Sequence, residues 1–159
     1  MEKIIIKSEL YLYKFDELDD ESKLLVNKAV EATNNSYSPY SNFRVGAALK
    51  LEDGSVVIGA NQENAAFSVT MCAERSAIFN AQSNHPELAI TSIAIAARNV
   101  EGIVKTPVSP CGSCRQVILE MEHRYKRNIR ILLCGKDGIY VADSIKDLLP
   151  LSFVDESMH

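Results

Sequence analysis

Helical and strand-like segments alternate along most of this 159-residue chain. Apolar residues at helical spacing predict helices over residues 18–34, 72–82 and 112–125, with a short capped helix at 144–149. Strand-like apolar runs occupy residues 43–51, 55–60, 90–97, 129–134 and 139–141. Consecutive parallel strands need crossover helices, so this alternation favours helices on both faces of one sheet. The chain is therefore predicted to form a three-layer α/β/α domain with a mixed, roughly five-stranded sheet.

Composition and charge exclude several classes of protein. Apolar residues make up 47% of the chain and charged residues 24%, which is typical of a folded globular protein. Lys and Arg number 17 against 21 Asp and Glu, a net charge of −4, so no excess of positive charge favours nucleic acid. No apolar run approaches the roughly 20 residues of a membrane span, and charges interrupt the N-terminal apolar runs, unlike a secretion signal. We expect a cytoplasmic protein with no nucleic-acid or membrane partner.

Three of the four cysteines stand at the beginnings of predicted helices. Cys72 begins the segment Cys-Ala-Glu-Arg, and Cys111 and Cys114 lie in the segment Pro-Cys-Gly-Ser-Cys. The free N–H groups and the dipole of a helix N-terminus favour the thiolate form. If both helices begin at one end of the sheet, the three sulfurs can bind one metal ion. Zinc suits thiolate ligands, and three protein ligands leave the fourth position open, as in catalytic sites. The spacing predicts one catalytic Zn²⁺ per chain.

Two charged residues follow Cys72 within three positions. Glu74 is close enough to reach the open position of the metal without being a ligand, so we expect it to shuttle protons. Three thiolates on a divalent ion give a net charge of −1, which makes a bound water less acidic. Arg75 is expected to offset this charge by donating hydrogen bonds to the thiolates. Cys-x-Glu followed by Pro-Cys-x-x-Cys is also the signature of zinc deaminases that act on nucleobases.

The likeness to one family extends beyond the zinc motif. Matching segments are Tyr-Ser-Pro-Tyr-Ser-Asn-Phe-Arg-Val-Gly-Ala-Ala at 37–48, Asn-Gln-Glu-Asn-Ala at 61–65, Ser-Pro-Cys-Gly-Ser-Cys-Arg-Gln at 109–116 and Leu-Leu-Pro at 148–150. The chain resembles the homotetrameric, three-cysteine cytidine deaminases of the cytidine and deoxycytidylate deaminase superfamily. The resemblance implies a zinc-dependent deaminase domain over residues 17–159. Residues 1–16 lie outside the usual pattern, and we expect an N-terminal extension able to add an edge strand.

The resemblance also implies a reaction. Cytidine and 2′-deoxycytidine would be hydrolysed to uridine and 2′-deoxyuridine with release of ammonia, as in pyrimidine salvage, by a zinc-activated hydroxide with Glu74 as the proton shuttle. Asn61 and Glu63 would hydrogen-bond the sugar hydroxyl, and such a buried donor and acceptor pair penalises an analogue that lacks the hydroxyl. The other substrate-binding residues would be Phe43 beside the base, Ala73 at the base edge, Phe67 near the pocket, and Phe153, which would close the pocket of a neighbouring subunit in a homotetramer.

Three other functions compete with this interpretation. A related deaminase of blasticidin S would share the zinc motif, although Asn-x-Glu-Asn favours a nucleoside. A dithiol redox protein would use Cys111 and Cys114 but has no use for Cys72 or Glu74. A structural zinc with four cysteines would need Cys134, which lies in an apolar run and is predicted to be a core residue. The segment 82–106 looks long for the family, and we expect residues 99–107 to reshape the pocket rim.

Overall fold

The structure, a computed structural model, describes residues 1–158. Within them, seven strands form one sheet in the order β1-β7-β6-β4-β2-β3, and β5 pairs with β4 beside this path. The strands are β1 (Tyr11–Tyr13), β2 (Arg44–Leu51), β3 (Val56–Ala60), β4 (Ile90–Asn99), β5 (Gly102–Ile103), β6 (Arg130–Cys134) and β7 (Ile139–Ala142). The β4–β6 pair is parallel and the other pairs are antiparallel. The sheet is therefore mixed, as predicted.

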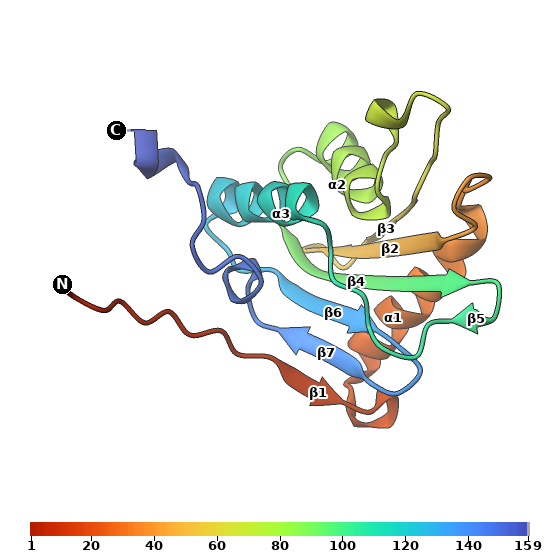
Figure 1. The fold of residues 1–159 in the computed structure, drawn as a ribbon, viewed down its shortest axis with the longest axis horizontal. Helices are drawn as coiled ribbons and strands as arrows, with labels where there is room; N and C mark the ends of the chain where they lie inside the picture. Colours follow the sequence, from red (N-terminus) through yellow and green to blue (C-terminus); the bar gives the residue numbers. More distant parts are fainter. Residues whose placement is uncertain (159) are drawn as a thin grey trace.

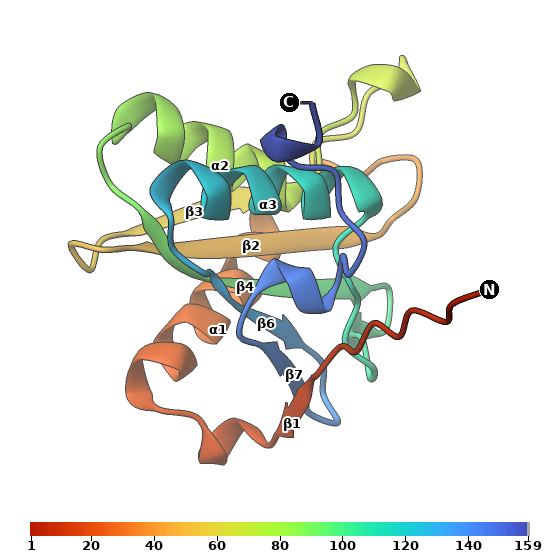
Figure 2. The same ribbon diagram turned by 90° about the vertical axis from the view of Figure 1, so that its left-hand side faces the viewer.

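Helices cover both faces of this sheet (Figures 1 and 2). Helix α1 (Asp20–Ala32) packs on one face, and α2 (Ala73–Asn84) and α3 (Gly112–Tyr125) lie side by side on the other. The alternation of side chains along β4 separates two cores: Ile93 and Ile95 belong to the core under α2 and α3, whereas Ala94 and Ala96 belong to the core under α1. The three-layer α/β/α prediction is confirmed.

The sheet has seven strands rather than about five because two of its strands are very short. Strand β1 has three residues and pairs with β7 at the edge of the sheet, and β5 has two residues and pairs with the end of β4. Strands of this length show too little alternation to be recognised in a sequence. Residues 1–10 before β1 are all exposed and form an extended tail. The last residue of the expected domain, His159, lies outside the described part.

Two glycines allow helices to approach the sheet closely, one on each face. A Cβ atom at Gly59 in β3 would lie 2.5 Å from the backbone nitrogen of Ala77 in α2. A Cβ atom at Gly46 in β2 would overlap the carbonyl oxygen of Ala29 and lie 2.6 Å from the nitrogen of Thr33 at the end of α1. Only glycine fits at contacts this short. The depth of α2 and α1 on the sheet is therefore determined by these two positions.

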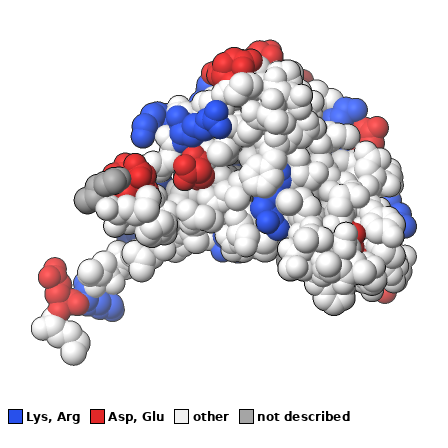
Figure 3. Space-filling model, turned by 90° about the horizontal axis from the view of Figure 1, so that it is seen from above, with Lys and Arg blue, Asp and Glu red and all other residues white. Residues whose placement is uncertain are grey.

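The predicted helix at 144–149 is a single 3₁₀ turn, Ile145–Asp147, and its expected cap is present, since the Ser144 hydroxyl accepts from the Lys146 N–H at 3.2 Å. None of the helices within residues 1–158 combines the length and the apolar character needed to cross a membrane. On the molecular face seen in Figure 3, basic and acidic side chains are mixed with large uncharged areas. This face offers no continuous basic surface of the kind that binds a polyanion.

Candidate active site

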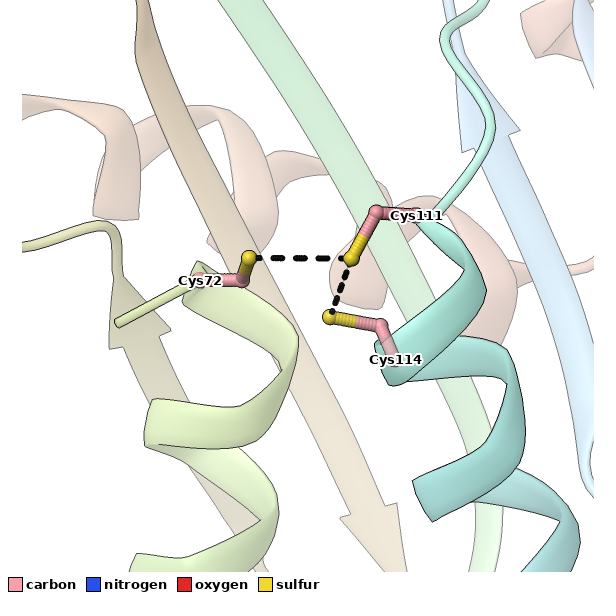
Figure 4. Close-up of side chains that lie close together, drawn as sticks. All are labelled: Cys72, Cys111 and Cys114. Carbon is pink, nitrogen blue, oxygen red and sulfur yellow. Dashed lines mark hydrogen bonds between the residues drawn. The ribbon is translucent and has the colours of Figure 1, made fainter. Parts of the chain in front are cut away.

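The three predicted metal ligands meet at the N-termini of α2 and α3 (Figure 4). Cys72 is the N-cap of α2, Cys111 is the N-cap of α3, and Cys114 lies in the first turn of α3. The Sγ atoms of Cys72 and Cys111 are 3.8 Å apart, those of Cys111 and Cys114 are 3.4 Å apart, and all three lie within 4.8 Å of one another. Strands β3, β4 and β6 run in the same direction, so α2, which follows β3, and α3, which follows β4, both begin at this end of the sheet.

The spacing of the sulfurs fits a zinc ion. Zn–S bonds of about 2.3 Å in a tetrahedral site put sulfur atoms about 3.8 Å apart, close to the separations in this trio. Cys134 is not near them. It is buried at the end of β6 among residues that pack under α1, on the opposite face of the sheet, and burial raises the pKa of its thiol to about 12. A four-cysteine structural zinc that includes Cys134 is therefore inconsistent with the fold.

The protein environment favours negative charge on the sulfurs. A hydrogen bond from Cys114, followed by those from Arg75 and Cys111, lowers the pKa of the Cys72 thiol to about 5. The same contact with Cys72, together with burial, raises the pKa of Cys114. Cys72 is therefore the more readily ionised of the two, and binding of a metal ion requires that both thiols lose their protons. Arg75 donates from Nη2 to the Cys72 sulfur at 3.5 Å, and this contact raises the pKa of its guanidinium.

Glu74 lies beside the cysteines in the first turn of α2 and is only 4% exposed. It lines a cavity of about 220 Å³ that Cys72 and Cys111 also line. Burial raises the pKa of the Glu74 carboxyl, and the negative charge of Cys72 raises it further. A carboxyl group of this kind can carry a proton at the wall of a cavity that also contains the metal ligands.

Asn61 also lines this cavity and follows directly after β3. Its Oδ1 accepts hydrogen bonds from the Ser36 hydroxyl at 2.6 Å and from the Val45 N–H at 2.7 Å. Its Nδ2 donates one hydrogen to the carbonyl oxygen of Phe43 at 2.9 Å. An amide nitrogen has two hydrogens, so one donor of Asn61 remains for a ligand. The orientation of the amide is determined by these three contacts.

Glu63 also lines the cavity, and its carboxylate holds the loop before β2. Its Oε2 accepts from the N–H groups of Tyr40 at 2.8 Å and Ser41 at 3.2 Å, and its Oε1 accepts from the Ser41 hydroxyl. These hydrogen bonds lower the pKa of Glu63, with the Ser41 hydroxyl as the largest cause. Glu63 is therefore an ionised acceptor near Asn61.

The aromatic candidates divide between the cavity and the surface. Phe43 lines the cavity, and so does Ala73, the first residue of α2. Phe67 instead lies in a protruding loop, 73% exposed, with its ring edge-to-face against Tyr40 at 5.8 Å. Phe153 lies 59% exposed beside α3, where its carbonyl oxygen accepts from Gln116. Neither Phe67 nor Phe153 is among the residues that line the cavity of this chain.

Several residues that were not singled out in the sequence also contribute to the site. The cavity wall is completed by Val45, Thr70, Met71, Ile95, Val108 and Ser109. Val108 and Ser109 follow the segment 99–107, none of whose residues lines this cavity, so the expected effect of that segment on the pocket rim stays a prediction. Ser36 belongs to none of the motif segments, and only the fold shows that it orients Asn61. Arg115 holds the segment before Cys111 by donating from Nε to the Pro110 carbonyl at 2.9 Å.

Comparison with known proteins agrees with this geometry. Residues 19–128 match the family model described as "Cytidine and deoxycytidylate deaminase zinc-binding region". The chain belongs to the cytidine and deoxycytidylate deaminase family. All three cysteines and Glu74 of this deaminase lie within the matched residues.

Similar deaminases cover nearly the whole fold. A cytidine deaminase of Halalkalibacterium halodurans is 39% identical over 139 residues, which are 87% of this chain and 98% of the relative. A cytidine deaminase of Sporosarcina psychrophila is 40% identical over 134 residues, 84% of this chain and 92% of the relative. The crystal structure of a Burkholderia pseudomallei cytidine deaminase superposes with a TM-score of 0.70 at 36% identity, over 86% of this chain and all of the other. The crystal structure of a Mycobacterium tuberculosis cytidine deaminase superposes with a TM-score of 0.67 at 31% identity, over 86% of this chain and 99% of the other.

These similarities decide between the functions that the sequence left open. The family membership and the meeting of three sulfurs support a zinc-binding hydrolytic deaminase over a dithiol redox protein. The similar curated proteins named above are cytidine deaminases, so a blasticidin S deaminase is not favoured.

Proposed function

We propose that this deaminase hydrolyses cytidine and 2′-deoxycytidine to uridine and 2′-deoxyuridine and releases ammonia. One observation carries the proposal: three cysteine sulfurs lie together, and two of these cysteines line one cavity with a buried glutamate, an oriented amide and a carboxylate. The cysteines and the glutamate suit hydrolytic attack on an aromatic amine. The amide and the carboxylate suit recognition of a sugar.

Cys72, Cys111 and Cys114 would hold one Zn²⁺ per chain. When bound, zinc acts as a Lewis acid and lowers the pKa of a water molecule in its open position. The chain's own residues moderate the charge of the three thiolates: Arg75 donates to the Cys72 sulfur, and the N-termini of α2 and α3 direct their dipoles toward the sulfurs.

Glu74 would perform the proton transfers. Its carboxylate would take a proton from the attacking water and deliver it to N3 of cytosine, as the new C4–O bond forms. It would then move the proton of the new C4 hydroxyl to the amino group, so that the C4=O bond forms, the C4–N bond breaks and ammonia leaves. The burial of Glu74 and its position on the cavity wall support this role. The backbone at Ala73 would hold the edge of the base.

Asn61 and Glu63 would select the nucleoside. The remaining N–H of the Asn61 amide and the Glu63 carboxylate form a donor and acceptor pair for a sugar hydroxyl. Phe43, on the same wall, would pack against the base or the sugar.

The family resemblance also suggests the assembly of the enzyme, its location and its role in metabolism. The active assembly would be a homotetramer in the cytoplasm, serving pyrimidine salvage. In it, the exposed Phe153 of one subunit would close the pocket of a neighbour, and Phe67 would lie at a pocket rim or an interface. Residues 17–159 would form the deaminase domain. The exposure of both aromatic rings in the single chain supports an interface for them.

Glu74→Gln tests the central claim. The amide keeps the shape of the side chain but cannot carry the proton, so kcat for cytidine should fall by about 10²–10⁴-fold. Zinc content, measured on the same sample by atomic absorption, should stay at about one per chain, the stoichiometry of a single three-ligand site. The exposed Glu87→Gln serves as the matched control and should keep full activity. Near-normal ammonia release by Glu74→Gln would remove Glu74 from the mechanism.

A further inference from the structure

Two arginines face each other across neighbouring strands, away from the deaminase cavity. Arg44 at the start of β2 pairs directly with Arg98 near the end of β4. Side chains of directly paired residues project from the same face of a sheet. Ala48, Ala94 and Ala96 share that face by the alternation of the strands, and they pack under α1. Like charges in this arrangement repel each other, so the pair is unfavourable unless an opposite charge accompanies it.

No acidic side chain within residues 1–158 forms an ion pair with either arginine. The guanidinium of Arg44 has no hydrogen bond or ion pair to any of residues 1–158. Arg98 donates from Nη1 to the Asn34 side chain at 3.0 Å, and its Nε is buried without a partner in the described part of the chain. A buried donor without an acceptor is unusual in a folded protein and costs free energy until an acceptor arrives.

Arg44 and Arg98 line a cavity of about 360 Å³. Both residues of this pair lie near the end of β4 from which the chain turns into β5, a turn that Figure 1 shows. The other lining residues of the cavity are Asn42, Asn99, Val100 and Gly102, and none of the six carries a carboxylate. The cavity therefore combines two positive charges with two amide side chains.

This cavity is separate from the proposed active site. The active-site cavity is lined by Val45 and Ile95, which project from the other face of β2 and β4. The neighbouring residues Arg44 and Ala96 point the opposite way. A nucleoside bound beside Glu74 therefore does not reach Arg98, and the arginine pair needs a ligand of its own.

We propose that Arg44 and Arg98 form a binding site for a phosphate group, either inorganic phosphate or the monoester of a small metabolite. Planar guanidinium groups bind phosphate oxygens in pairs, and charge-assisted hydrogen bonds of this type are stronger than neutral ones. A dianion would relieve the repulsion between the arginines and accept from the unpartnered Nε of Arg98. Asn42 and Asn99 would contact the organic part of a monoester.

Thermal unfolding of the purified, full-length, zinc-loaded protein tests the site. The midpoint should rise with millimolar inorganic phosphate or ribose 5-phosphate, at an ionic strength held constant with KCl, because a ligand that binds only the folded state stabilises it.

In Arg44→Gln the apparent Kd for phosphate should be about tenfold higher, as expected for the loss of a charge-assisted contact. In phosphate-free buffer the same variant should be at least as stable as the natural chain, since the repulsion is gone. The monoester binds more tightly than inorganic phosphate if the amides contribute.

Arg127→Gln provides the matched control, because Arg127 is exposed and lies outside this cavity. It should retain the full response to phosphate. An equal phosphate response in all three proteins would overturn the proposal, because it would indicate a general salt effect. The proposal would also be overturned if Arg44→Gln lowered the stability in phosphate-free buffer and changed the oligomeric state, since the arginines would then pair with an acidic group of a second copy.

Discussion

Asn61 shows how strongly the function of one side chain depends on its neighbours. A carboxamide has two orientations of similar shape, and only one of them presents a donor to a sugar hydroxyl. Here the Ser36 hydroxyl and the Val45 N–H both contact Oδ1, which selects that orientation. Ser36 therefore acts through Asn61 as a positioning residue.

Ser36→Ala should raise KM for cytidine with little change in kcat. The loss of one neutral hydrogen bond of about 1 kcal/mol predicts a decrease of roughly fivefold in kcat/KM. Ser36→Thr keeps the hydroxyl and should retain most of the kcat/KM of the natural chain. Ser55→Ala, which removes a hydroxyl from the exposed turn between β2 and β3, is the matched control and should leave both constants unchanged. A loss confined to kcat would show that Ser36 does not act through substrate binding.

At the scale of elements, the metal site depends on how deeply α2 sits on the sheet, since Cys72 caps that helix. Gly59→Ala should push α2 outward, because the new Cβ would meet the backbone of Ala77. Overpacking of this kind costs about 1–3 kcal/mol. We expect a lower midpoint of urea unfolding and also a weaker affinity for zinc, measured by competition with a chelator.

Gly46→Ala is the matched control for this experiment. It creates a similar clash on the opposite face, against α1, so it should destabilise the fold to a comparable extent. Its folded fraction should nevertheless bind zinc with normal affinity. If both variants weakened zinc binding equally, the position of α2 would not be the cause.

Glu122 connects three elements through a buried carboxylate. It accepts from the Ile129 N–H at 2.8 Å before β6, and from the Ser144 hydroxyl at 2.8 Å and the Ile145 N–H at 3.0 Å at the 3₁₀ turn. Glu122→Ala leaves these buried donors without an acceptor and should destabilise the protein by about 3 kcal/mol. Chemical denaturation measures this, with the exposed Glu120→Ala on the same helix as the control. A difference below about 1 kcal/mol between the two variants would contradict the role, being within the range of surface substitutions.

The elements around these contacts were predicted to different degrees. Helix α3 begins and ends at the predicted residues 112 and 125, because apolar spacing and the cysteine motif both mark it. Strand β1 lies within residues 1–16, where an edge strand was expected, and it pairs with β7 at the edge of the sheet. Strand β5 was not predicted, since two residues show no periodicity, and its position depends on pairing with the end of β4.

At the scale of the whole molecule, the N-terminal extension contains two different parts. Residues 1–10 are exposed, and a backbone hydrogen bond from Glu9 to the Asp147 side chain at 3.1 Å holds their end. Residues 11–13 are a strand at the sheet edge, and Tyr13 packs against the core under α1. The boundary at residue 16 stays a prediction.

Deletion of residues 1–9 should change the thermal midpoint and the activity very little, since almost no buried surface is lost. Deletion of residues 1–16 should lower the midpoint and promote association, because it removes the β1–β7 ladder and exposes β7 as an unpaired edge. Calorimetry and light scattering on the two truncated proteins distinguish these outcomes. Equal behaviour of the two would show that β1 contributes nothing to stability.

The sequence by itself determined the fold class and which three cysteines come together, and it predicted the zinc chemistry that they support, because periodicity and helix-start cysteines are local patterns with direct physical meaning. The tertiary structure decided which residues complete the site. Ser36 reaches Asn61, and Cys134 lies away from the other cysteines, only because of how helices and strands pack over long sequence separations. The same holds for Arg44 and Arg98, whose side chains face each other through the register of β2 and β4. Such neighbours arise from pairing between distant segments, which no local pattern encodes.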